Sequence, residues 1–209
     1  MAYSETNGLK RTIVEIGRRL YARGLIAAYD GNISCRAGAN GGTVFWITPS
    51  GVSKGFLTED MLIGLDENER VTEGEGRPSS ESGLHLRIYR ENPAARAIVH
   101  AHPPAATALA CMGRSLERPV LPEVLSTLGP VPLAPYAAPG SPGVAENAAP
   151  YAKTHNGVLL ANHGAVTWAG DLWQSYYYME KLEHFADIML RVSAAGGQAK
   201  EILPQGGTD

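Results

Sequence analysis

The sequence lacks three features that would place it in common functional classes: paired cysteines, an excess of basic residues and long apolar segments. Cys35 and Cys111 match no C-x-x-C pattern, so a disulfide framework is not expected and a reducing compartment is the default. Lysine and arginine total 18 against 21 acidic residues, and the net charge of −3 disfavours nucleic acid as a partner. No segment resembles a secretory signal or a membrane helix. We therefore expect a soluble, cytoplasmic protein that binds no membrane.

The chain has 209 residues, of which 44% are hydrophobic, enough for one well-packed domain over residues 1–209. Apolar spacing and turn residues predict helices over 9–20, from near 80 to 91, over 104–112, over 144–153 and from 172 onward. Strands are predicted over 32–36, 44–48, 62–65, 97–100, 131–134, 158–161 and 165–168, with a glycine-rich turn at 38–42. The pattern indicates an α/β fold with a mixed or mainly antiparallel sheet covered by helices on both faces.

Two histidines, His100 and His102, lie two apart at the end of a predicted strand, so their side chains point to the same face. His163 follows another apolar strand. Three neutral imidazoles would leave an open coordination position, which is typical of a catalytic zinc site. Several divalent ions accept such ligands. From these residues alone, a metal site and a set of structural histidines remain alternatives.

The other three histidines are not part of this strand-end pattern. His85 and His184 lie in predicted helices among charged residues, so we expect both at the surface. His155 precedes Asn-Gly and is interpreted as part of a helix C-terminus.

Glu81 follows two serines, Ser79 and Ser80, at a predicted helix start. This pattern is typical of a helix cap, but the same geometry makes a helix N-terminus an anion site. Gly31-Asn32 and Ser50-Gly51 are further turns where backbone can approach a ligand. Lys54 could add a positive charge there, although a solvated lysine is the simpler interpretation.

Taken in order, six segments resemble the class II aldolase/adducin family: DGNIS (30–34), TPSG (48–51), PSSE (78–81), HAHP (100–103), APY (134–136) and ANHG (161–164). The ordered set covers nearly the whole chain. The resemblance implies a three-layer αβα fold with a central, mainly antiparallel sheet. It also implies a homotetramer with sites between subunits.

The resemblance assigns roles to individual residues. His100, His102 and His163 match the metal ligands, and Glu81 matches the catalytic carboxylate, which can also bind the metal before substrate arrives. The cofactor implied is Zn²⁺, with Mn²⁺ or Co²⁺ as other suitable ions. The residues that match the cradle for the substrate phosphate are Gly31, Asn32, Ser50, Gly51, Ser79 and Ser80.

The chain departs from the family pattern at two places near these residues. Tyr29-Asp30 stands where aldolases often carry a small hydroxyl residue ahead of Gly-Asn, so the need for a substrate phosphate stays open. Glu123 stands where some aldolases have a tyrosine that donates a proton from a neighbouring subunit. We take Glu123 as a second candidate catalytic residue.

The implied activity is reversible retro-aldol cleavage of a ketose phosphate, such as L-fuculose 1-phosphate, to dihydroxyacetone phosphate and an aldehyde. The metal would act as electron sink, and Glu81 would shuttle a proton to or from the carbanion carbon. Epimerisation, dehydration and decarboxylation of sugar phosphates at the same site are alternatives within the family. A non-catalytic, adducin-like interaction domain is the alternative of a different class.

Overall fold

Antiparallel pairing dominates the sheet at the centre of the structure, a computed structural model that describes residues 2–39 and 42–202. The strands are β1 (Asn32–Ala39), β2 (Gly42–Ile47), β3 (Ile63–Leu65), β4 (Val71–Glu73), β5 (Ala97–Ala101), β6 (Leu133–Ala134), β7 (Gly157–Leu160) and β8 (Gly164–Ala169). Their order is β4-β3-β2-β1-β5-β8-β7-β6, and only β6 and β7 pair in parallel. The predicted mainly antiparallel sheet is therefore confirmed.

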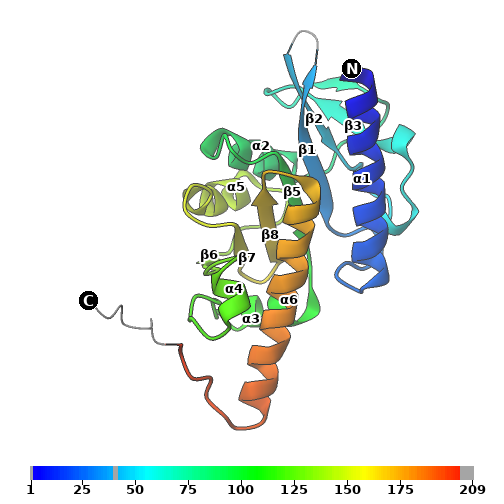
Figure 1. Cartoon of the computed structure of the whole chain (residues 1–209). Coiled ribbons are helices and arrows are strands. Elements are labelled where there is room, and N and C mark those ends of the chain that lie inside the picture. The colour runs from blue at the N-terminus through cyan, green and yellow to red at the C-terminus, as the bar shows by residue number, and fades with distance from the viewer. Residues whose placement is uncertain (1, 40–41, 203–209) are drawn as a thin grey trace.

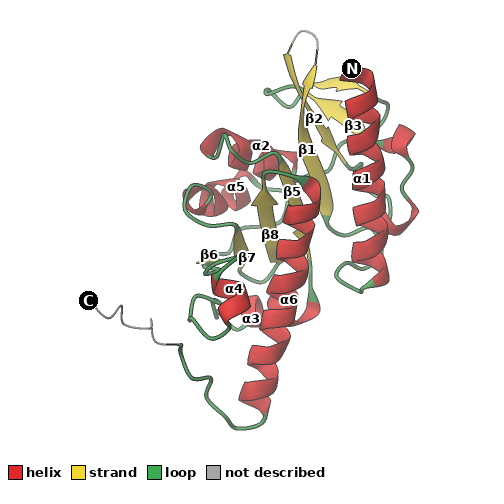
Figure 2. Ribbon diagram, viewed as in Figure 1, coloured by secondary structure: helices red, strands yellow, loops and turns green. Residues whose placement is uncertain are grey.

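Helices cover both faces of this sheet (Figures 1 and 2). The α-helices are α1 (Ala2–Ala22), α2 (Ser82–Glu91), α3 (Pro104–Cys111), α4 (Pro122–Leu125), α5 (Pro142–Ala148) and α6 (Leu172–Ala194). Helices α1 and α6 lie on the face toward the viewer in Figure 1, and α2 and α5 lie behind the sheet. The result is the three-layer αβα arrangement expected from the resemblance.

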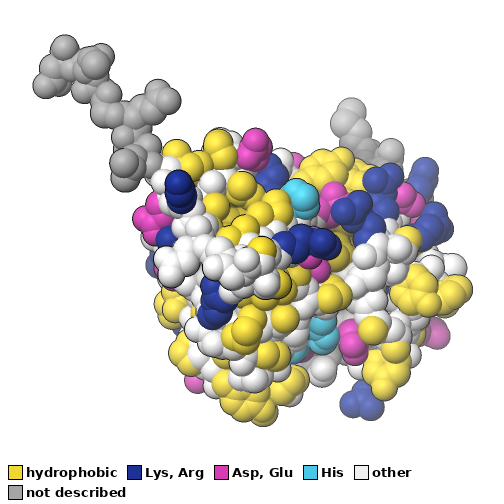
Figure 3. All heavy atoms as spheres, turned by 90° about the horizontal axis from the view of Figure 1, so that it is seen from below, with side chains coloured by type: hydrophobic (Ala, Val, Ile, Leu, Met, Phe, Trp, Pro, Cys, Tyr) yellow, Lys and Arg dark blue, Asp and Glu magenta, His cyan; other side chains and the backbone are white. Residues whose placement is uncertain are grey.

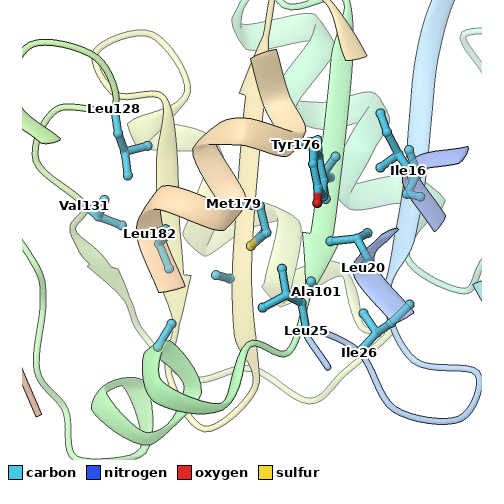
Figure 4. Close-up of a cluster of buried hydrophobic side chains, with 14 of the residues drawn as sticks. Ile16, Leu20, Leu25, Ile26, Ala101, Leu128, Val131, Tyr176, Met179 and Leu182 are labelled. Carbon is cyan, nitrogen blue, oxygen red and sulfur yellow. The ribbon is translucent and has the colours of Figure 1, made fainter. Parts of the chain in front are cut away.

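Two hydrophobic clusters hold the layers together, one on each face of the sheet. On the first face, Tyr176, Met179 and Leu182 of α6 point onto the sheet beside Ile16 and Leu20 of α1 (Figure 4). The second cluster joins α2 and α5 to the other side of the sheet. Because strand side chains alternate, β2, β5, β7 and β8 contribute to both clusters, whereas β1 contributes apolar side chains to the first cluster only and carries Asn32 and Ser34 on its other face.

The predicted elements match the structure with a few differences. The helix expected over 144–153 is divided into α5 and the 3-10 turn η3 (Ala149–Tyr151), because Pro150 lacks an N–H and cannot continue an α-helix. Strand β4 and helix α4 are too short to give a periodic signal and were not predicted. The predicted turn at 38–42 includes residues 40 and 41, which lie outside the described residues.

None of the helices in the described part of the chain combines the length and apolar character needed to cross a bilayer. Two short 3-10 turns, η1 (Lys54–Phe56) and η2 (Glu59–Met61), connect β2 to β3 and pack against α1. The turn η1 matters for the site because it begins with Lys54, whose ammonium group bonds to the loops described below.

Candidate metal and acid–base site

The three predicted histidines meet at one end of the central strands. His100 and His102 end β5 and lead into α3, and His163 lies in the turn between β7 and β8. Strand β8 pairs with β5, which brings this turn beside the end of β5. One ring nitrogen from each histidine can be chosen so that all three lie within 4.8 Å of one another. The prediction that these residues cluster is confirmed.

Two glycines allow the backbone to come this close. A Cβ on Gly164 would lie 2.5 Å from the Ala101 carbonyl oxygen and 2.6 Å from the His102 ring. A Cβ on Gly31, whose φ is +70°, would lie 2.7 Å from the His100 carbonyl oxygen. Any other residue at either position would push the histidine strand away from its neighbours.

Glu81 reaches this cluster from the first residue before α2. One carboxylate oxygen, Oε2, lies 3.0 Å from His100 Nε2, and the other, Oε1, lies 3.4 Å from His163 Nε2. The Asn32 amide donates a hydrogen bond of 2.9 Å to Oε2. Glu81 is therefore a buried acid that faces two of the three histidines, beside the residues with which the family resemblance groups it.

Hydrogen bonds fix how His100 presents its ring. Its Nδ1 lies 2.9 Å from the Ala165 carbonyl oxygen, which only accepts, so Nδ1 carries a proton and Nε2 faces Glu81 and His102. His102 Nε2 is 3.2 Å from His100 Nε2. Two imidazole nitrogens and a carboxylate thus turn toward one another, an arrangement that a proton or a cation between them stabilises.

The pKa shifts of these groups show which of them favour a charged form. Burial opposes a charge on His100, but the Glu81 carboxylate outweighs it and raises the pKa of His100. Burial and the neighbouring His100 lower the pKa of His163 to about 4. Burial also opposes ionisation of Glu81, yet His100 and His163 hold the pKa of Glu81 well below its ordinary value. The cluster therefore pairs an ionised Glu81 carboxylate with His100, whose charged form it favours, beside a His163 ring that stays neutral.

These groups fit a divalent metal. Neutral imidazoles and a carboxylate are the donors that zinc and related ions accept. Within the described residues, the buried Glu81 Oε1 has no hydrogen-bond partner, so it keeps an acceptor free toward the histidines. An unpaired buried carboxylate oxygen is costly unless a cation compensates for it.

Asp30 adds a second carboxylate behind the histidines. Its Oδ2 lies 3.6 Å from His102 Nδ1, the ring nitrogen that faces away from His100. A carboxylate at this position orients a ligating imidazole and makes it a better donor. The departure from the family pattern at Tyr29-Asp30 therefore supplies a partner for His102.

Figure 3 shows histidine side chains at the surface of the face seen from below, bordered at one place by acidic and hydrophobic side chains. A separate cavity of about 270 Å³ lies beside Glu81 and Ser80 and is lined by Arg87, Arg90 and Ser141 among others. The histidines do not line this cavity. Glu81 lines the cavity, but the three imidazoles converge beside its carboxylate outside the cavity.

The structure also brings together the loops predicted to hold a phosphate. Pro49 and Pro78 form an isolated β-bridge, which places Ser50-Gly51 beside Ser79-Ser80. The Ser79 N–H donates to the Thr48 carbonyl oxygen, and the Thr48 hydroxyl accepts a bond from the backbone N–H of Ile33, next to Asn32. Asn32 differs from the other residues predicted to hold the phosphate because its side-chain amide is hydrogen-bonded to Glu81 and to His85.

Lys54 is not a solvated lysine. It is 3% exposed, and its ammonium group donates to the carbonyl oxygens of Tyr29 at 2.6 Å and Val52 at 2.9 Å. Burial lowers the pKa of Lys54 to about 8, against the opposing influence of Asp30 and Glu81. The simpler interpretation from sequence was wrong because the close packing of η1 on α1 was not visible in the spacing.

His85 corrects a second prediction. We expected it at the surface, but it is 1% exposed and its ring bonds to Ser34 and Asn32. The signal that could have found it is the spacing of four between Glu81, His85 and Tyr89, which places all three on one face of a helix. His184 is exposed as expected, and His155 follows η3, where its carbonyl oxygen accepts a bond from the Trp168 indole.

Glu123 lies apart from the histidine cluster. Its side chain is exposed on α4, and its backbone carbonyl oxygen accepts bonds from Lys181 and Thr127. Among the described residues, no hydrogen bond or ion pair joins the Glu123 carboxylate to the cluster. Any catalytic role for Glu123 would therefore require a second copy of the chain, as the resemblance implied.

The αβα fold and the acid beside three histidines define the class of protein. Residues 11–190 match the family described as Class II Aldolase and Adducin N-terminal domain, and the chain belongs to this family.

Individual members of the family show which proteins this chain is similar to. The chain is 36% identical over 183 residues to 3-oxo-tetronate 4-phosphate decarboxylase from Haemophilus influenzae, covering 86% of this chain and 85% of that protein. It is 33% identical over 175 residues to L-fuculose phosphate aldolase from Methanococcus maripaludis, covering 84% and 92%. The structure of YgbL from Klebsiella pneumoniae superposes with a TM-score of 0.87 at 31% identity, covering 95% of each chain.

Proposed function

We propose that this protein is a metal-dependent lyase that breaks a carbon–carbon bond next to a ketone in a small phosphorylated substrate. The first candidate reaction is decarboxylation of a 3-oxo acid phosphate. The observation that carries the proposal is Glu81: a buried, ionised carboxylate 3.0 Å from His100, with one oxygen free toward the histidines.

His100, His102 and His163 would hold the divalent ion, with Glu81 as a further ligand before substrate enters. A zinc-type ion bound there would polarise the substrate ketone and stabilise the negative charge that develops on its oxygen. Asp30 would orient His102, and Ala165 would orient His100, so both imidazoles are supported from behind.

Glu81 would carry the proton. In a 3-oxo acid the bond between the carboxyl carbon and C2 breaks, CO₂ leaves, and the electron pair passes into the C2–C3 bond and onto the ketone oxygen. Protonation of C2 then restores the ketone. Glu81 lies beside the histidines and would take this proton from water and deliver it to C2, because the substrate would displace Glu81 from the cation and raise its proton affinity.

Two observations favour decarboxylation as the first candidate. Relatives of 31–36% identity from several bacteria are 3-oxo-tetronate 4-phosphate decarboxylases. In addition, decarboxylation needs one proton transfer after the bond breaks, for which Glu81 faces His100 and His163, whereas Asp30, the other nearby carboxylate, faces His102 Nδ1. Retro-aldol cleavage must also remove a proton from the substrate hydroxyl, and the second candidate residue, Glu123, is not at the site of its own chain.

Retro-aldol cleavage of a ketose phosphate is the second candidate function. The 33% identity to an L-fuculose phosphate aldolase favours it. In this reaction a homotetramer, or another assembly with sites between subunits, would bring Glu123 of one copy to the histidines of the next. The mass of the protein in solution and the rate of Glu123→Gln test this arrangement together.

The loops at Gly31, Ser50-Gly51 and Ser79-Ser80 would hold the substrate phosphate. They present small residues and backbone amides around the cluster, and Lys54 places a buried positive charge beneath Tyr29 and Val52. The substrate class supported is therefore a sugar phosphate or sugar-acid phosphate.

The test is turnover of purified, zinc-loaded protein on 3-oxo-tetronate 4-phosphate and on a panel of ketose 1-phosphates, with protein stripped by EDTA beside it. Metal-dependent CO₂ release from the acid would support the decarboxylase, and aldehyde release from a ketose phosphate would support the aldolase. Absence of both, with zinc shown to be bound, would overturn the proposal in favour of epimerase, dehydratase or non-catalytic roles.

A further inference from the structure

A continuous line of buried polar side chains runs from Glu81 along α2 toward the C-terminal end of that helix. It consists of Glu81, Asn32, His85, Ser34 and Tyr89, each of which is at most 9% exposed. Buried polar groups are retained in an apolar layer only when each finds a partner. Here each member bonds to the next, so the five residues form one network, which we call the α2 relay.

The relay follows from matching spacings on two elements. Glu81, His85 and Tyr89 are four residues apart along α2, which corresponds to about 6 Å of helix rise. Asn32 and Ser34 are two residues apart on β1 and face the same side, which corresponds to about 6.8 Å along a strand. Because the two repeats are nearly equal, the side chains interleave across the interface between β1 and α2.

The distances describe an unbroken chain of hydrogen bonds. Asn32 Nδ2 lies 2.9 Å from Glu81 Oε2, and Asn32 Oδ1 lies 2.6 Å from His85 Nε2. His85 Nδ1 lies 2.6 Å from Ser34 Oγ, which in turn lies 2.8 Å from the Tyr89 hydroxyl.

The donors along this chain can be assigned in only one consistent direction. An ionised Glu81 accepts, so the Asn32 amide must turn its NH₂ group to Glu81 and its oxygen to His85. His85 then donates from Nε2 and accepts at Nδ1, Ser34 donates to Nδ1, and Tyr89 donates to Ser34. The opposite tautomer of His85 would turn the Asn32 oxygen against the Glu81 carboxylate.

The surroundings of His85 and Tyr89 keep both groups neutral. Burial, followed by the nearby His100, lowers the pKa of His85 to about 3. Burial raises the pKa of Tyr89 well above its ordinary value. The four relay residues behind Glu81 therefore carry no charge and end in the Asn32 N–H donor directed at Glu81 Oε2.

We propose that His85, Ser34 and Tyr89 are positioning residues that act through Asn32 to hold the Glu81 carboxylate in its reactive orientation. The terminal torsion of a glutamate side chain rotates broadly, so an unsupported carboxylate would spend much of its time misaligned. With Oε2 held by Asn32, Oε1 is left facing the histidines. This inference rests on the proposed function in one respect, the role of Glu81 in proton transfer.

Two substitutions break the relay at a distance from the reacting atoms. Ser34→Ala removes the donor to His85, and Tyr89→Phe removes the outer hydroxyl while keeping the ring that packs on Phe45. Ser175→Ala is the matched control, because Ser175 is also fully buried and hydrogen-bonded but lies on α6 against Thr167. All are measured as zinc-loaded protein with thermal melting beside the kinetics.

The expected result is a fall in kcat of about tenfold for Ser34→Ala, the usual size of effects that act through a supporting residue, with a smaller fall for Tyr89→Phe. KM and the zinc affinity, measured by competition with a chelator, should change less than about twofold because neither substrate contacts nor histidine ligands are removed. Ser34→Ala and Tyr89→Phe turning over as fast as Ser175→Ala, or losses equal in kcat and KM, would overturn the inference.

A second measurement needs no turnover. ¹⁵N NMR of histidine-labelled protein at pH 7, with His85 identified by its absence in His85→Gln, should show a neutral ring protonated on Nε2. A ring protonated on Nδ1, or on both nitrogens, would overturn the relay even in an active enzyme. Conversely, an inactive protein with the Nε2-protonated ring would count against the proposed function and leave the relay standing.

Discussion

Glu81 and Glu183 are two carboxylates that lie on either side of the same stretch of chain, residues 100–106, and the structure treats them in opposite ways. Glu183 of α6 accepts bonds of 2.9 Å from the Ala105 and Ala106 amides, one on each oxygen. Glu81 Oε2 accepts a bond from Asn32 and lies 3.0 Å from His100 Nε2, while its other oxygen faces the histidines without a hydrogen bond in the described structure.

The difference follows from what each carboxylate has to satisfy. Helix α3 begins with Pro103-Pro104, so no side chain at its own start caps the first free amides, and Glu183 takes that role from α6. Its bonding capacity is directed at the backbone. Glu81 keeps capacity in reserve beside three imidazoles. A carboxylate that is satisfied by the fold is structural, whereas one left partly unsatisfied near potential ligands marks the reactive site.

The largest expected effect that separates the two residues is on turnover. Glu81→Gln should lower kcat by a factor of about 10² to 10⁴, the usual contribution of a proton-transfer group, because the amide cannot exchange the proton. Glu183→Gln should stay within about twofold of the original rate. Steady-state kinetics on the zinc-loaded variants provide the measurement. Full turnover by Glu81→Gln with zinc retained would contradict the assigned role.

The second prediction concerns metal-linked stability. With free zinc at about 100 times its Kd, the folded protein should gain about 2.7 kcal/mol in unfolding free energy. Glu183→Gln should gain the same increment, because Glu183 lies outside the cluster. His102→Ala should gain far less, since it lacks a ligand. Urea unfolding with and without zinc measures these increments, and an equal gain in His102→Ala would place the metal elsewhere.

The third prediction concerns stability without metal, where Glu183 is the carboxylate that matters. Glu183→Ala should reduce the unfolding free energy of metal-free protein by about 2 kcal/mol, because two amides at the start of α3 lose a charged acceptor. Glu75→Ala, at an exposed carboxylate, should change it by less than about 0.5 kcal/mol. Urea unfolding measures both. Equal stability of the two variants would mean that water replaces Glu183 at no cost.

The smallest expected effect is on pH dependence. Burial raises the pKa of Glu183 despite its two backbone hydrogen bonds. The folded state therefore binds a proton more tightly than the unfolded chain, so the proton-linked part of the Glu183 contribution to stability is full below the ordinary pKa of about 4.3 and is lost as the pH rises through the raised value. Glu183→Gln should lack this dependence. Between pH 4 and 7, the unfolding free energy of the original protein should fall relative to that of Glu183→Gln as the pH rises. Parallel curves for the two proteins would rule out the raised pKa of Glu183.

Several features of the fold and site could be predicted from the sequence. Apolar spacing gave the long helices and the central strands, since 3.6-residue and two-residue repeats reflect local burial. The two-residue spacing of His100 and His102 placed both on one face, and the ordered motifs added His163 and Glu81. These are properties of short segments, or of a pattern shared with a known family.

What the tertiary structure alone decided is which distant residues meet. The spacing of Glu81, His85 and Tyr89 gave them one helix face, but only the packing of α2 on β1 showed that Asn32 and Ser34 fill the gaps between them. Likewise, the residues around Lys54 in the sequence suggested a solvated lysine, but Lys54 is buried because η1 packs on α1. Sequence periodicity fixes which way a side chain points, whereas burial and bonding partners depend on what another element places opposite it.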